Sequence, residues 1–229
     1  MAWPLDLVTL QPMKLLRVLV ATSLVLAACG GSGATDEPAS TYPTGTVREW
    51  LVAVSTRDVA RLVNIVDQDS LVIVIAIENQ IPADDVERML VQGLAAETIA
   101  DYWVSFAGAY GTYTGLALDS VTVRGFEQFA VEDIVFARVE VGDDQDPGVV
   151  FTRSYDGIWK VDLVATLGDA LFPVIEDFVR GIPNGDETSQ LRAELREAIL
   201  PALLAIDSQK PESERRATAI ARLGALLTP

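Results

Sequence analysis

One cysteine and no histidine limit the chemistry open to this chain of 229 residues. Without histidine, the Ser-His-Asp and Cys-His arrangements of nucleophilic catalysis and the usual zinc and haem ligands are excluded. A single thiol, Cys29, excludes an internal disulfide. Any catalysis must therefore use carboxylates, tyrosine, lysine or arginine.

An acidic segment, residues 143–148, is the one stretch that invites a metal. Asp144 and Asp146 have the spacing of the first two ligands of an EF-hand loop. The pattern then fails, because Gly148 and Val149 stand at the next two positions. The segment is typical of a solvated hairpin loop, with weak calcium binding as the alternative, and we expect no metal and no cofactor.

The surroundings of Cys29 indicate export. An apolar run over 15–28 is preceded by Lys14 and interrupted by Arg17. It ends in Leu26-Ala27-Ala28-Cys29, before a glycine-rich segment. A basic start, a short apolar stretch and small residues at a processing point are typical of a secretory signal. The run has 14 residues, whereas a membrane-spanning helix needs about 20.

The end of this signal resembles the lipobox of bacterial lipoproteins. The resemblance implies cleavage before Cys29, attachment of diacylglycerol to its sulfur and acylation, commonly with palmitate, of the new amino terminus. It places the protein at the cell membrane, lipid-anchored on the extracytoplasmic face. An ordinary cleaved signal with an incidental cysteine is the alternative.

Charge and apolar content constrain the partners and the organisation of the chain. The formal net charge of −16 disfavours nucleic acid and anionic lipid head groups as partners. With 50% apolar residues, the chain can bury a sizeable core. The expected organisation is a signal peptide (1–28), a flexible tether (29–45), a folded domain (46–182) and a helical extension (183–229).

Periodicity predicts helices in the first half of the domain. Capping-box spacings at Thr46 and Ser55 predict two short amphipathic helices that meet at residues 55–56. The apolar run 71–77 is interpreted as a buried strand, with a buried helix as the alternative. A further helix is expected after Pro82, and a longer one over about 94–106.

The second half changes to a period of two. Residues 121–124 and 135–141 alternate as strands, and Asp156-Gly157 predicts a two-residue hairpin turn. That turn sets Ser154 opposite Trp159 and Thr152 opposite Val161, on a face that also carries Val150 and Leu163 and looks into the core. The other face carries Phe151, Arg153, Lys160 and Asp162.

Three helices are expected to end the chain. The first starts near Leu171, because a proline at 173 is tolerated only in a first turn. The other two, about 187–208 and 212–227, have apolar faces that must be buried. Packing as a hairpin on the same chain is the preferred interpretation, and a partner chain is the alternative.

This order of elements gives an α+β class, with N-terminal helices packed on a curved antiparallel sheet and a C-terminal helical hairpin. The helix pair 47–66 with its Arg57-Asp58 junction, and the hairpin 155–161, resemble the NTF2-like (cystatin-like cone) superfamily. The resemblance covers about residues 45–182. It implies a sheet that wraps around helices and encloses a pocket.

Aromatic and hydroxyl side chains supply further candidate site residues. Possible pocket-lining residues are Trp159, Ser154, Thr152, Trp103 and Tyr102. Aromatic side chains at helical or strand spacing are usually plain core, and the same holds for Trp50 and Phe106. The hydroxyls of Ser154 and Thr152 are the only hint of a polar pocket.

One branch of the superfamily, the steroid isomerases, uses a carboxylate base with a tyrosine and a protonated acid. Asp101, Tyr102, Asp133 and Asp162 have the right residue types, but no local motif assigns them. The hairpin register places Asp162 on the outward face near Arg153, which favours a surface ion pair.

The sequence therefore supports two hypotheses. The leading one is a lipid-anchored envelope lipoprotein whose domain binds a small ligand or an envelope protein without catalysis. The rival is a histidine-free isomerase or hydratase that uses a pocket carboxylate.

Overall fold

The computed structural model describes residues 41–228 with the exception of 116, 144–146 and 210–213. The class is α+β: a four-stranded antiparallel sheet, in the order β1-β2-β3-β4, follows five helices and precedes three more within the described residues.

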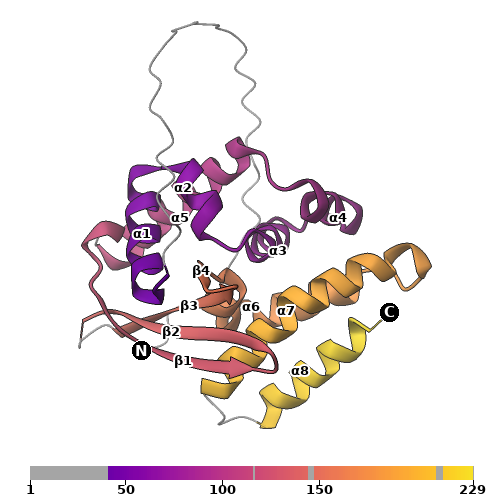
Figure 1. Ribbon diagram of the computed structural model, residues 1–229. Coiled ribbons are helices and arrows are strands. Elements are labelled where there is room, and N and C mark those ends of the chain that lie inside the picture. The colour runs from indigo at the N-terminus through magenta and orange to yellow at the C-terminus, as the bar shows by residue number, and fades with distance from the viewer. Residues whose placement is uncertain (1–40, 116, 144–146, 210–213, 229) are drawn as a thin grey trace, which may run out of the picture. The chain divides into compact units, whose positions relative to one another are not determined.

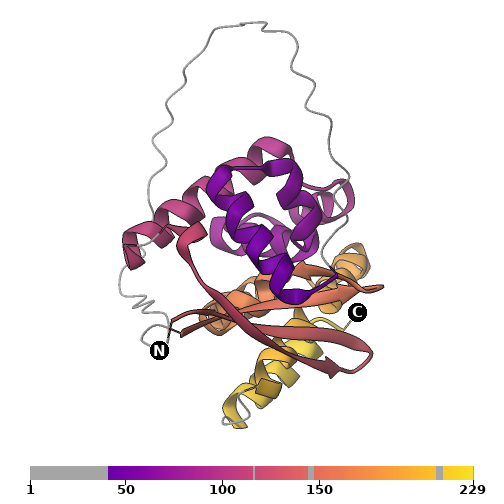
Figure 2. The ribbon, with the colours of Figure 1, turned by 60° about the vertical axis from the view of Figure 1, so that its left-hand side comes forward.

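Two layers of helices enclose the sheet (Figures 1 and 2). Helix α1 contacts all four strands on one face, whereas α6 contacts β3 and α7 contacts β1. The elements before the sheet are α1 (Pro43–Thr56), α2 (Val59–Ile65), α3 (Gln68–Asn79), α4 (Ala83–Gln92), α5 (Ala96–Thr114) and a short 3-10 turn (Leu118–Ser120). The remaining elements are β1 (Val123–Val131), β2 (Ile134–Gly142), β3 (Pro147–Tyr155), β4 (Ile158–Val161), α6 (Leu163–Gly181), a second 3-10 turn (Asp186–Thr188), α7 (Ser189–Gln209) and α8 (Glu214–Leu226).

Helices α1 and α2 form the expected pair, but their first residues differ from the expectation. Helix α1 begins at Pro43, inside the segment expected to be tether. Thr46 is therefore no cap: its hydroxyl donates to the carbonyls of Tyr42 and Trp159, which ties α1 to β4. Asp58 caps α2 by accepting a hydrogen bond from the Arg61 amide at 3.1 Å, after Arg57 ends α1 in a left-handed conformation.

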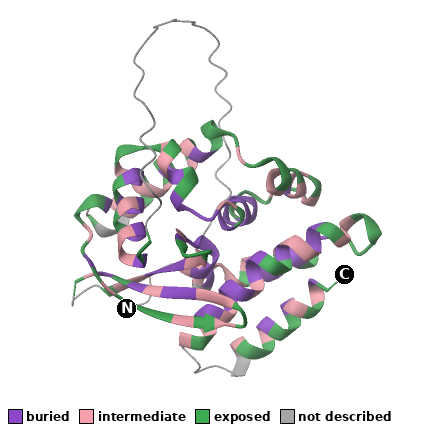
Figure 3. Cartoon of the chain, viewed as in Figure 1, coloured by how far each residue is buried: buried purple, intermediate pink, exposed green. Residues whose placement is uncertain are grey.

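The strand expected at 71–77 is wrong, because these residues form helix α3 (Figure 3). Every residue from Leu71 to Ile77 is buried, with at most 4% of its surface exposed. A helix that is covered on all sides has no polar face, so its sequence shows no helical period. Helices α4, α6 and α7 contact α3, and these tertiary contacts override the β-branched composition.

The hairpin register is confirmed. Tyr155 pairs with Ile158, Ser154 with Trp159 and Thr152 with Val161. Asp156 and Gly157 both have positive φ angles, of 52° and 85°, as a type I′ turn requires.

The expected inward face of the hairpin is buried at Val150, Thr152, Trp159 and Val161. The opposite face is covered as well, since α6 packs on β3 and buries Phe151. The hairpin therefore has a core on both faces where helices cover it.

Helix α6 begins at Leu163, eight residues before the expected start, so strand β4 stops at Val161. Leu163 consequently pairs with no strand residue, and Pro173 lies inside the helix. The proline removes one backbone hydrogen bond, a local cost that the burial of Ile175 and Val179 offsets.

Helices α7 and α8 lie side by side and run antiparallel. Arg196 near the start of α7 donates to the Thr228 hydroxyl after the end of α8. Helix α6 contacts both, and Arg222 of α8 forms an ion pair with Glu176 of α6. Most of the C-terminal apolar surface is thus buried on the same chain, whereas Leu200 and Leu204 of α7 remain partly exposed.

Candidate functional site

A buried polar cluster lies where α3 and α6 begin. The two helix starts are joined through the backbone, because the Asp67 amide donates to the Val161 carbonyl at 2.9 Å. Ser70 adds a second link: its hydroxyl donates to the Asp67 carbonyl and accepts from the Leu163 amide. The residues that directly precede the two helices, Asp67 and Asp162, therefore lie in the same interior region.

Asp162 is fully buried, so the expected surface ion pair with Arg153 is wrong. It follows the last residue of β4 and caps α6: its Oδ1 atom accepts from the Ala165 amide at 2.8 Å. Strand β4 ends at Val161, so the alternation that placed Asp162 on the outward face does not extend to this residue. The second oxygen, Oδ2, is buried with no hydrogen-bond partner.

Asp67 is 6% exposed and accepts a hydrogen bond on Oδ2 from the Tyr155 hydroxyl at 2.9 Å. Tyr155 leaves 37% of its surface exposed, so its ring lies between this carboxylate and solvent. The side chains of Arg153 and Lys160 approach the same ring, 5.1 and 5.6 Å from its centroid. The cluster is thus acidic inside and basic at its rim.

Burial dominates the electrostatics of the cluster. Burial, and then the negative charge of Asp67, raise the pKa of Asp162 to about 7. Burial also raises the pKa of Asp67, partly offset by the Tyr155 hydrogen bond and by the charges of Arg153 and Lys160. The pKa of Tyr155 is raised too, by burial and by Asp67.

These groups are the residue types of acid–base catalysis: a carboxylate, a tyrosine and an acid that is protonated near neutral pH. Their hydrogen bonds also have a structural role, since Asp162 Oδ1 caps α6 and Asp67 Oδ2 is engaged by Tyr155. Asp67, Ser70 and Tyr155 were not among the site residues predicted from the sequence. The helical alternative for 71–77 would have made Asp67 the residue before a helix and a candidate cap.

The other acid–base candidates lie apart from this cluster. Asp101 and Asp133 are exposed. Burial, and then the charge of Glu78, raise the pKa of Tyr102. Of the four candidates, only Asp162 belongs to the buried acid cluster.

The pocket-lining candidates divide into two groups. Tyr102 and Trp103 join Trp50 and Phe106 in an aromatic cluster between α1 and α5, with ring centroids 4.9 to 6.3 Å apart. Trp159, Ser154 and Thr152 lie on the hairpin. Among the described residues, no ring contact joins Trp159 to the aromatic cluster.

The aromatic cluster contains unpartnered donors. The indole nitrogens of Trp50 and Trp103 and the hydroxyl of Tyr102 are buried without a hydrogen-bond partner. On the hairpin, the fully buried Thr152 hydroxyl is likewise unpartnered. Each such group costs about 1–3 kcal/mol, so a cluster of three favours an acceptor at this place.

Two sequence candidates fall at least partly outside the described residues. Cys29 and the signal precede residue 41, and residues 144–146 of the acidic loop are not described. Within the described part of the chain, no acidic or cysteine cluster could hold a metal, and no helix has the length and apolarity of a membrane span. No protein-family model, no curated protein and no solved structure matches the chain.

Proposed function

We propose that this chain is a lipoprotein, anchored through lipidated Cys29 on the extracytoplasmic face of a cell membrane. The observation that carries the proposal is the sole cysteine, placed at the end of Leu26-Ala27-Ala28-Cys29 after a basic, apolar leader. Two or three acyl chains hold a protein firmly at a bilayer, whereas one chain binds only marginally.

The anchor is tested by Cys29→Ser. The wild-type chain, produced in a bacterial host, should enter the detergent phase of a detergent–water separation, and the variant should move to the aqueous phase. Ser120→Ala, a small change at an exposed position, is the control and should leave partitioning unchanged. A Cys29→Ser chain that still enters the detergent phase contradicts the proposal.

The folded domain acts, on this proposal, as a non-catalytic module that binds a small ligand or an envelope protein. The aromatic cluster supports binding, because Trp50, Trp103 and Tyr102 offer three buried donors that lack an acceptor. A molecule with carbonyl or carboxylate oxygens would satisfy them. Native mass spectrometry of the lipid-anchored chain from its own host tests this: a copurifying mass should appear in the wild type and disappear in Trp103→Phe.

A second candidate function is acid–base catalysis by an isomerase or hydratase without histidine. The specific observation in its favour is Asp162, whose buried Oδ2 is unpartnered next to Asp67 and Tyr155 and whose pKa lies near neutrality. It ranks second because the other polar atoms of the cluster hold α3 and α6 in place.

The NTF2-like relationship is part of the same proposal. It is supported by the α1–α2 pair with its Arg57-Asp58 junction, followed by a meander that closes with the Asp156-Gly157 turn. Helix α3 in place of a strand, and helices on both faces of the sheet, depart from the plan expected from the sequence.

A further inference from the structure

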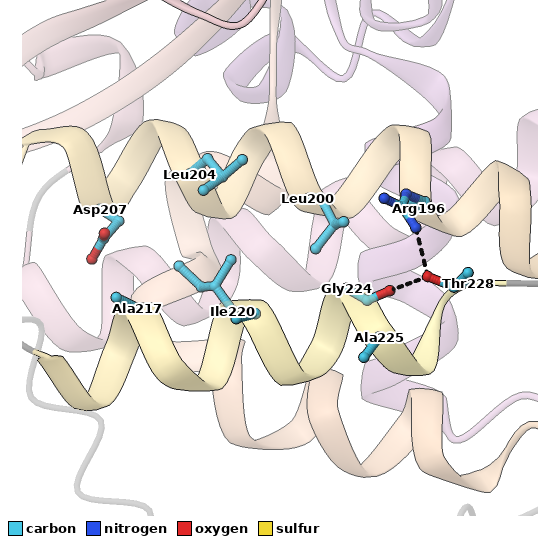
Figure 4. A pocket seen from close by; sticks show the side chains of 10 residues that line it. Arg196, Leu200, Leu204, Asp207, Ala217, Ile220, Gly224, Ala225 and Thr228 are labelled. Atoms are coloured by element: carbon cyan, nitrogen blue, oxygen red, sulfur yellow. Dashed lines mark hydrogen bonds between the residues drawn. The ribbon is translucent and has the colours of Figure 1, made fainter.

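A groove between α7 and α8 lies on the surface of the chain (Figure 4). Its volume is about 430 Å³. One wall is formed by α7, with Leu200 and Leu204 between Arg196 at one end and Asp207 at the other. The opposite wall is formed by residues of α8, mostly small ones such as Ala217 and Ala221, together with Ile220.

The four α7 residues form one stripe. Arg196, Leu200 and Leu204 are spaced by four residues and Asp207 follows three later, so all four lie on one face of the helix. The two charges are eleven residues apart along α7, about 16 Å. They are too far apart to pair within the chain.

Both charges lack an ion-pair partner among the described residues. Arg196 donates only to the Thr228 hydroxyl, at 2.7 Å. Asp207 has a buried Oδ1 atom without any hydrogen-bond partner. The second oxygen of Asp207, Oδ2, is not among the buried atoms and has no hydrogen-bond partner among the described residues, so a donor from another chain can reach this carboxylate there.

The stripe is self-complementary under a two-fold axis. The midpoint of Arg196 and Asp207 falls between Pro201 and Ala202, and the midpoint of Leu200 and Leu204 falls on Ala202. A second α7 laid antiparallel across this point sets Arg196 opposite the partner's Asp207, and Asp207 opposite the partner's Arg196. The same operation brings the leucines of the two copies together, as in the isologous interfaces of two-fold dimers.

We propose that the groove between α7 and α8 is an interface with a second copy of this chain, in a two-fold dimer whose axis crosses the exposed side of α7 at the height of Ala202. The two reciprocal ion pairs fix the antiparallel direction, and the leucines supply the apolar contact. This interface shares no residue with the aromatic cluster or with the buried acid cluster. It goes beyond the proposed function and requires neither a ligand nor the lipid.

The experiment is sedimentation velocity of the full chain in a density-matched detergent, at about 0.15 M salt to screen the overall negative charge. The wild type should sediment as a dimer. Arg196→Asp and Asp207→Arg should each weaken the dimer by about tenfold or more, because each sets like charges opposite one another. An equal mixture of the two variants should restore a 1:1 dimer, since both Asp–Arg pairs are re-formed between unlike chains.

The matched control is Glu197→Arg, which makes the same charge change as Asp207→Arg at an exposed position of α7 outside the groove. It should leave the dimer unchanged, and circular dichroism should be the same for all variants. If a charge variant loses its helical spectrum, Ala221→Arg decides in its place, because it fills the groove from an exposed position. A wild type that is monomeric up to about 100 µM, single variants that dimerise as the wild type does, or a mixture that stays monomeric each overturn the proposal.

Discussion

The two ends of helix α6 are held by side chains of opposite charge that reach it in different ways. At the start, Asp162 is adjacent in sequence and accepts a hydrogen bond from the Ala165 amide. Beyond the end, Arg192 arrives from α7 and donates to the carbonyls of Ile182 and Pro183. Both arrangements satisfy orphan backbone groups and match the helix dipole.

Each of the two side chains keeps one buried atom without a hydrogen-bond partner, Arg192 Nε and Asp162 Oδ2, so the ends differ chiefly in whether the charge depends on pH. Arg192 also donates to the Asn184 side chain and to the Leu226 carbonyl at the end of α8, and a guanidinium keeps its charge across physiological pH. Asp162 retains an unpartnered oxygen beside a second acid, Asp67, so its charge depends on pH. The side chain that holds the end of α6 therefore keeps a constant charge, whereas the side chain that holds its start changes its charge with pH.

The largest expected effect concerns the hairpin that supports the start of α6. Trp159→Ala removes a side chain that is 6% exposed and should lower the free energy of unfolding by about 3–5 kcal/mol in chemical denaturation. Lys160→Ala, on the opposite face, is the control and should cost less than about 1 kcal/mol. Equal losses would contradict the register that places Tyr155 over Asp67.

The second largest loss of stability is expected at the end of α6, where Arg192 donates its hydrogen bonds. Arg192→Met keeps much of the apolar stem but leaves carbonyls of Ile182 and Leu226 without this donor, so unfolding should become easier by roughly 2–3 kcal/mol. Because no titrating group is removed, this loss should be the same at pH 5 and pH 8. Arg88→Met, on α4, breaks only an exposed ion pair with Asp85 and should cost no more than about 0.5 kcal/mol.

The smallest effect sharpens the contrast, because it appears only as a pH dependence. The pKa of Asp162 is raised from 3.8 to about 7, so the folded state holds a proton that the unfolded state releases. Stability from this group is therefore complete below about pH 4 and is lost as the pH rises toward 7 and beyond, on the order of 2 kcal/mol between pH 5 and pH 8. Asp67 changes in the same direction.

Asp162→Asn should flatten this slope, since an asparagine oxygen can still cap α6 but cannot ionise. Thermal or urea unfolding at several pH values provides the comparison, with Asp58→Asn at the exposed cap of α2 as the control. The control should keep the wild-type slope. If Asp162→Asn also keeps the wild-type pH dependence, the protonation of Asp162 does not control stability at the start of α6.

Several elements of the fold could be predicted because their signals are local. Asp156-Gly157 set the hairpin register, since positive φ angles at both residues allow only one kind of turn. The amphipathic stripes of α7 and α8 identified both helices, because their outer faces meet water. Helix α3 was missed for the converse reason: it is buried all round, and its sequence has no polar face.

The candidate sites were less predictable, because they depend on contacts across the chain. Asp162 was placed outward by strand alternation, and only the switch from β4 to α6 at that residue carries it into the interior. Asp67 and Tyr155 are 88 positions apart in sequence, and no local pattern connects them.

By itself, the sequence determined the chemistry that is excluded, the hairpin register and the helices whose faces meet water. The reason is that residue inventory, turn geometry and amphipathic period are properties of the chain over a few residues. Only the tertiary structure decided that 71–77 is a helix, that Asp162 is buried beside Asp67, and that Arg196 and Asp207 flank one groove. Burial and the approach of distant charges are set by packing, and packing free energy belongs to many residues at once.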